Sequence, residues 1–205
     1  MKKVLLSVVA LFAFGFANAQ EAETTENAGF AQGDVFISGA LTFNSSKTGD
    51  FKENAFQIAP KAGYFVTDNI AVGLMVAYQS NKVDFGSADA TNDGFGVGAF
   101  GRYYFTPASK FSLFGELGVN YMGYNNEYVE TTSGYSAVDY KSKVFGAQLG
   151  AGMNYFVSSN FSIEAGVGVL GFSTDDNGGN GADKTNSFSF GGNWTAVTFG
   201  VNYKF

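Results

Sequence analysis

Four charged residues stand in segments that otherwise alternate between apolar and polar side chains, each on the side opposite the apolar one. They are Lys61, Arg102, Glu116 and Glu164. If that side faces an interior, two cations and two carboxylates meet there, and buried charges are tolerated only when paired. We therefore predict an internal network of ion pairs, with a gate or proton path as the alternative. Further polar candidates for this network are Gln57, Gln148 and Asn154.

One pair within this network can be placed from the turn beside it. If Phe105 and Phe111 face each other across that turn, Glu116 lies opposite Phe100 and diagonal to Arg102. An ion pair between Arg102 and Glu116 is therefore our hypothesis.

The sequence lacks the residue that usually acts as the general base in hydrolysis and acyl transfer. The sequence contains no histidine and no cysteine. Lipases, acyltransferases and proteases that are built on membrane barrels rely on a histidine to activate a serine or a water. We therefore expect no enzyme and no cofactor. The absence of thiols fits an exposed or oxidising compartment without requiring one.

Two kinds of binding motif are also suggested by the sequence. Residues 96–101 and 166–171 both fit G-x-G-x-x-G, but neither string begins a helix, as a dinucleotide site requires. We interpret these glycines as sites of close packing. A glycine-rich loop carries oxygen ligands suited to calcium, yet the spacing matches no EF-hand, so we predict a solvated loop and no metal site. Its oxygen-bearing residues are Asp175, Asp176, Asn177 and Asp183.

The beginning of the chain has the pattern of a secretory signal peptide. Lys2 and Lys3 precede an apolar run over 4–16, and Ala17-Asn18-Ala19 supplies the small residues that signal peptidase accepts, so cleavage is expected before Gln20. Thirteen apolar residues would form a helix of about 20 Å, too short for a hydrocarbon core of about 30 Å. We expect residues 1–19 to be a cleaved signal peptide and 20–32 a flexible periplasmic leader.

Composition favours β-structure and excludes nucleic acid as a partner. The 205 residues include 28 Gly, 23 Phe and 11 Tyr but only 2 Pro. Without Lys2 and Lys3, 10 basic residues face 18 acidic ones, and phosphate binding calls for clustered cations instead.

From Gly33 to Phe205 the apolar residues recur with a period of two, which predicts eight strands. The segments are 35–43, 56–66, 70–78, 95–105, 111–121, 145–155, 161–169 and 197–205. Short connections (67–69, 106–110, 158–160) alternate with long ones (45–54, 80–93, 125–140, 173–187). This asymmetry is typical of a transmembrane barrel with short periplasmic turns and longer outer loops. The fold class is therefore all-β, an eight-stranded antiparallel up-and-down transmembrane β-barrel over 33–205.

Aromatic bands distinguish this barrel from a soluble one of the lipocalin type. Tyr and Phe gather at the strand ends with aliphatic residues, Ala and Gly between them, as membrane-interface girdles require. In this reading the lower girdle includes Phe65, Tyr104 and Phe156. Pro60 lies within a strand and lacks an N–H, so a bulge or local break is expected there.

The barrel segment resembles the small outer-membrane barrels, which comprise OmpA-type membrane domains, OmpX and OmpW-like proteins. The resemblance rests on 199–205 (FGVNYKF), on Arg102-Tyr103-Tyr104-Phe105 and on the leader that ends in Ala-Asn-Ala-Gln. It implies that the assembly machinery of outer-membrane barrels reads Val201, Tyr203 and Phe205 as its signal. It also implies an address in the cell outer membrane of a Gram-negative envelope, among outer-membrane lipid.

Our leading functional hypothesis is a structural or interaction scaffold, monomeric, with a mostly filled lumen. The alternative is a narrow porin-like channel or transporter for small solutes, hydrophobic ones included. The long loops suggest an extracellular ligand, which the sequence does not name.

Overall fold

A computed structural model describes residues 28–130, 136–179, 181–191 and 197–205, and it is all-β in these ranges. The strands are β1 (Val35–Thr48), β2 (Phe51–Phe65), β3 (Ile70–Asp84), β4 (Ala88–Tyr104), β5 (Phe111–Glu130), β6 (Ser136–Phe156), β7 (Phe161–Asp175), β8 (Thr185–Phe190) and β9 (Thr198–Lys204). No helix in these ranges is long and apolar enough to cross a membrane.

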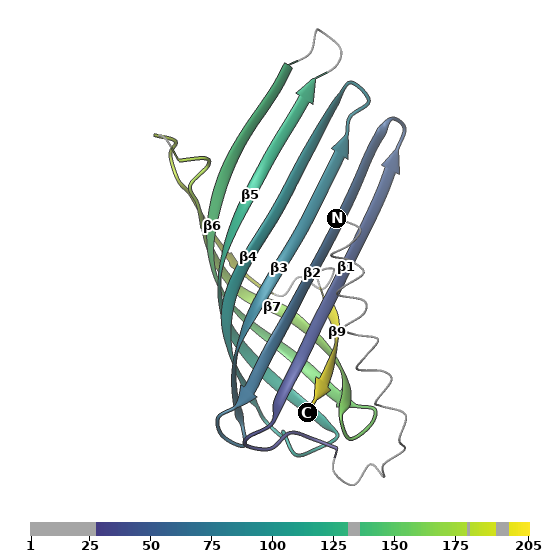
Figure 1. Cartoon of the computed structure of the whole chain (residues 1–205), viewed down its shortest axis with the longest axis vertical. Helices are drawn as coiled ribbons and strands as arrows, with labels where there is room; N and C mark the ends of the chain where they lie inside the picture. The colour runs from purple at the N-terminus through teal and green to yellow at the C-terminus, as the bar shows by residue number, and fades with distance from the viewer. Residues whose placement is uncertain (1–27, 131–135, 180, 192–196) are drawn as a thin grey trace.

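The strands close into an antiparallel barrel, as the sequence predicts. Neighbours in the chain pair in order from β1 to β7, and β9 pairs with both β7 and β1, which closes the sheet. The pairing of β7 with β9 extends along β7 from Phe161 to Gly166, and the short β8 pairs with the following part of β7, from Leu170 to Asp175. Because β6 occupies one side of β7, β8 and β9 follow each other along the other side and form the eighth strand of the barrel in two pieces. Figure 1 shows β9 between β1 and β7, where it closes the sheet.

Three of the predicted long loops are largely strand. β1 and β2 are joined by two residues, Gly49 and Asp50, and pairing between β5 and β6 continues to Glu130 and Ser136. β5 and β6 have 20 and 21 residues, about twice what a tilted strand needs to cross a membrane. Sequence reasoning missed these extensions because polar residues predominate there and apolar ones such as Tyr128, Val138 and Tyr140 are too few to give the sustained alternation that marks a strand.

The fourth predicted loop, 173–187, and the end of the seventh strand also differ from expectation. β7 continues to Asp175, and β8 begins at Thr185. A bulge shifts the register between β6 and β7, so that Gly168 faces Gly150 and Leu170 faces Leu149. The extra residue, Val169, was expected on the outer face. After the bulge the outer face is taken over by Leu170 and Phe172, because one inserted residue reverses the alternation.

Pro60 produces a break in one ladder without a bulge. β2 is continuous through Pro60, which pairs with Gly39 of β1. On the other side, the ladder with β3 lacks the pairs at Ala59 and Pro60 and resumes in the same register at Lys61. The missing N–H of Pro60 therefore interrupts the ladder between β2 and β3 locally, as expected for proline in a closed sheet.

Apolar side chains cover the outside of the barrel, while its inside is packed at the end with the short turns. Leu74 and Leu117 are 69% and 61% exposed on the outer face, whereas Phe36 is fully buried in the lumen. Only a lipid environment makes such an apolar exterior favourable. Three residues expected in the lower girdle lie in the lumen instead, because alternation turns them inward: Phe65, Tyr104 and Phe156.

Candidate functional site

An aromatic layer closes the lumen at the end with the short turns. Its centre is Phe30, which is 2% exposed and stacks on Phe65 with ring centroids 4.6 Å apart. The ring of Phe156 meets it edge-on at 4.8 Å, and that of Tyr104 lies at 5.3 Å. Aromatic contacts at these distances add to the free energy of burial. This aromatic layer consists of Phe30, Phe36, Phe65, Phe100, Tyr104, Phe114 and Phe156.

Residues 28–32, the end of the segment expected to be a flexible leader, contact the barrel in the structure. The N–H of Phe30 donates to Pro107 O at 2.8 Å, and Lys204 Nζ donates to Gly29 O at 2.6 Å. Gly29 adopts a φ of 150° against the backbone of Ala108, where a Cβ would have no room. Phe30 is the one aromatic residue between 20 and 32, and this was the signal in the sequence that this part of the chain packs against the barrel.

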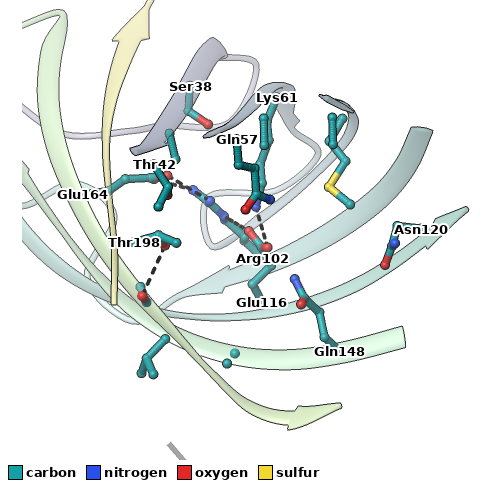
Figure 2. Close-up of a pocket in the computed structure, with 18 of the residues that line it drawn as sticks. Ser38, Thr42, Gln57, Lys61, Arg102, Glu116, Asn120, Gln148, Glu164 and Thr198 are labelled. Atoms are coloured by element: carbon teal, nitrogen blue, oxygen red, sulfur yellow. Dashed lines mark hydrogen bonds and ion pairs between the residues drawn. The ribbon is translucent and has the colours of Figure 1, made fainter. Parts of the chain in front are cut away.

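The four predicted charged residues form a layer directly next to the aromatic one. Arg102 Nε donates to Glu116 Oε2 at 2.5 Å, and Arg102 Nη1 donates to Glu164 Oε2 at 2.8 Å. Lys61 Nζ donates to the other oxygen of Glu116 at 2.6 Å. The Arg102 side chain is 2% exposed. Figure 2 shows this charge layer, made of Lys61, Arg102, Glu116 and Glu164, with its ion pairs as dashed lines.

The predicted register between β4 and β5 is wrong by two residues. Glu116 lies opposite Arg102, while Phe100 faces Gly118. The turn is wider than assumed, since Phe105 donates its N–H to Leu113 O and not to Phe111. The shift brings Arg102 and Glu116 closer than a diagonal pair.

The network extends to residues that sequence reasoning only partly found. Asn202 Nδ2 donates to Glu164 Oε2 at 3.0 Å and to Asn154 Oδ1 at 2.8 Å, so Asn154 joins the network through Asn202. The Tyr104 hydroxyl accepts a hydrogen bond from Arg102 Nη1 at 3.1 Å. Asn202 was missed, although it alternates with the outward residues of the last strand and must therefore point inward.

The guanidinium group also joins the two layers. Its carbon lies 4.4 Å from the ring centroid of Phe114 and 5.4 Å from that of Phe100. Arginine stacks on aromatic faces in this way while keeping its hydrogen bonds to carboxylates. The charge layer and the aromatic layer therefore form one packed unit.

A cavity of about 360 Å³ lies on the other side of the charge layer, toward the long hairpins. Lys61, Arg102, Glu116 and Glu164 form part of its wall. Gln57 and Gln148, which were candidates for the ion-pair network, line this cavity instead. Two cations against two carboxylates leave the charge layer formally neutral.

The two glycine strings and the acidic loop each have a structural role in the barrel. Both glycine strings lie within strands, β4 and β7. In the acidic loop, Asp175 Oδ1 accepts the N–H of Asn177, and Asp176 Oδ1 accepts that of Lys143. No cluster of three metal-ligating side chains occurs where the structure describes the chain.

The last strand presents its proposed assembly signal outward. Asn202 and Lys204 point into the barrel, and the alternating residues Val201, Tyr203 and Phe205 take the other face. The Phe205 N–H donates to Val35 O at 3.0 Å. Ala17, Ala19 and Gln20 lie outside the described residues, as does the whole expected signal peptide.

A comparison with protein families decides the class of this barrel. The family model described as "Outer membrane protein beta-barrel domain" matches residues 7–205. The chain belongs to this family. It is an outer-membrane β-barrel protein, as the aromatic bands and the apolar exterior indicate. No curated protein sequence matches it significantly.

The chain is also similar in fold to solved structures of other proteins. The translocator domain of the autotransporter NalP from Neisseria meningitidis is 15% identical, with a TM-score of 0.50 and coverage of 98% of this chain and 76% of that one. OprG from Pseudomonas aeruginosa is 19% identical, with a TM-score of 0.45 and coverage of 86% and 98%. Neisserial surface protein A is 21% identical, with a TM-score of 0.45 and coverage of 86% and 99%. At these identities the likeness concerns the fold alone.

Proposed function

We propose that this protein is a structural scaffold of the outer membrane whose lumen does not conduct. The observation that carries the proposal is the stacking of the charge layer on the aromatic layer across the barrel. Eight strands enclose an interior just wide enough for side chains to fill. Here the lumen is filled near the periplasmic end by Arg102, whose side chain is 2% exposed, and by Phe30, which is 2% exposed as a whole residue.

Opening this barrier requires the loss of several interactions at once. Arg102 would leave both Glu116 and Glu164, and a buried charge that loses its partner costs about 3 to 5 kcal/mol. Phe30 would also leave four aromatic neighbours. A barrier of this kind favours a permanently closed lumen over a gated one.

Planar-bilayer recording of the purified protein tests the proposal. We expect no stable single-channel currents and at most rare, small openings. Circular dichroism of the same protein, reconstituted into lipid vesicles, serves as the control that the barrel inserts and folds. Steady currents of general-porin size would overturn the scaffold function.

The cavity supports a second candidate, a narrow channel or transporter for small solutes, hydrophobic ones included. The cavity reaches from the long hairpins to the charge layer, so a solute would have only the two packed layers left to pass. Swelling of protein-containing vesicles in isosmotic glycerol discriminates the candidates. Swelling above that of protein-free vesicles would favour transport.

The parts of the hairpins that extend past the membrane support an interaction role beside the structural one. Tyr128 and Tyr140 are exposed there, and exposed aromatic residues are enriched at binding surfaces. We propose a monomer that sits in outer-membrane lipid and offers these hairpins to an extracellular ligand. Sedimentation of the micelle-bound protein tests the monomeric state.

A further inference from the structure

We propose that the cavity above the charge layer binds a small, neutral, polyhydroxylated compound of monosaccharide or polyol size. The compound would reach it from the end of the long hairpins. This inference adds a ligand to the proposed scaffold and relies on its closed lumen, because a lumen blocked at one end retains a solute instead of passing it on.

Four side-chain amides from four different strands line this cavity. They are Gln57 on β2, Gln79 on β3, Asn120 on β5 and Gln148 on β6. None of these amides has a side-chain hydrogen bond to another described residue. Asn154 and Asn202, on the periplasmic side of the cavity, differ in this respect. They are hydrogen-bonded to each other, Asn154 also accepts from Ser162, and Asn202 also donates to Glu164. The four cavity amides are therefore available to a ligand.

Hydroxyl groups are the natural partners of such a lining. A side-chain amide carries both donors and an acceptor, and a hydroxyl group likewise donates and accepts. Thr42 and Thr198 add hydroxyls of their own to the wall. A compound with several hydroxyl groups could bond to amides on opposite strands at the same time (Figure 2).

The charges at the bottom of the cavity select against ions. Arg102 is shared between Glu116 and Glu164, and Lys61 is paired with Glu116, so positive and negative groups balance. An anion or a cation would have to compete with a partner that is already in place. A neutral compound avoids this competition.

Size and apolar surface narrow the class further. The volume of about 360 Å³ lies near the lower end of the range of about 300 to 1,000 Å³ for small-molecule sites. It is large enough for one sugar ring. Met75, Met122 and Tyr124 supply surface against which the C–H face of a ring can pack.

Saturation-transfer NMR on the full protein in detergent micelles tests the proposal. The probes are D-glucose, D-galactose and sorbitol, with glycine as a zwitterionic and 1-hexanol as an apolar comparison. We expect saturation transfer to at least one of the three polyols and weaker transfer to glycine and hexanol. No transfer to any polyol, or stronger transfer to glycine or hexanol, would overturn the assignment.

A matched pair of variants on β5 locates the binding. Asn120→Leu removes an amide from the cavity, whereas Asn125→Leu makes the same change at an exposed position that does not line it. We expect about fivefold weaker binding for the first and no change for the second, as for the loss of one hydrogen bond. Equal effects in both would place the binding elsewhere. Gln148→Met replaces Asn120→Leu if the latter fails to fold.

The bilayer recordings keep the two proposals separate. Absent binding together with absent currents would overturn the ligand and leave the scaffold intact. Stable currents would overturn the scaffold whatever the binding result.

Discussion

Arg102 and Glu116 lie directly opposite each other on β4 and β5, and their side chains are joined by a 2.5 Å hydrogen bond between charged groups. The arginine is also bonded to Glu164, so its removal would leave two buried carboxylates without their main cation. This geometry makes Arg102 the centre of the charge layer.

Arg102→Ala is expected to lower the free energy of unfolding by about 3 to 5 kcal/mol, because the carboxylates remain buried and unpaired. Adding Glu116→Gln and Glu164→Gln should recover much of this loss. Urea unfolding in micelles, followed by circular dichroism, measures both effects. If the effects of the single and combined changes were simply additive, the residues would not be coupled.

Phe30→Ala is expected to lower the free energy of unfolding by about 3 to 5 kcal/mol, the usual range for a buried phenylalanine. The matched control is Phe190→Ala on β8, where the side chain is 80% exposed and should contribute less. The same urea titration compares the two. Equal destabilisation would mean that Phe30 does not anchor residues 28–32 in the lumen.

Deletion of Phe205 should reduce the amount of folded barrel in the outer membrane while export across the inner membrane continues. Its side chain is 64% exposed and its N–H makes one bond to Val35 O, so the folded protein should lose only about 1 kcal/mol. Heat-modifiable gel mobility of the membrane fraction measures folded yield. Phe199→Ala, at another exposed position of β9, is the control. An unchanged yield in the deletion would show that Phe205 is not an assembly signal.

The contact between Asp176 and β6 should weaken in acid. The N–H of Lys143 holds the pKa of Asp176 below its ordinary value of 3.8, and the N–H of Gly178 acts in the same direction. Because the folded pKa is the lower one, the stabilisation is complete above pH 3.8 and is lost as the pH falls through the lowered pKa.

Amide hydrogen exchange at Lys143 measures this loss. Its protection factor should fall in acid in the natural protein and should already be low, and independent of pH, in Asp176→Ala. Constant protection of the natural protein down to pH 2 would contradict the assignment.

Much of the architecture could be predicted from local patterns. Alternation with a period of two marks most of the segments that face lipid on one side, and the outward-facing aromatic residues mark where such a segment leaves the membrane. The inward positions of Lys61, Arg102, Glu116 and Glu164 follow from the same alternation, because a strand turns successive side chains to opposite faces. Eight antiparallel strands and an outer-membrane address were therefore within reach of the sequence.

The filling of the lumen was decided by the tertiary structure. Which inward side chains meet depends on the register of each hairpin, and a shift of two residues preserves the alternation, so local pattern could not distinguish Phe100 from Arg102 as the partner of Glu116. Phe30 lies outside every alternating segment, and its burial depends on a lumen that exists only once β9 has closed on β1. Alternation is a property of one strand, whereas contact across a barrel requires all eight to be in place.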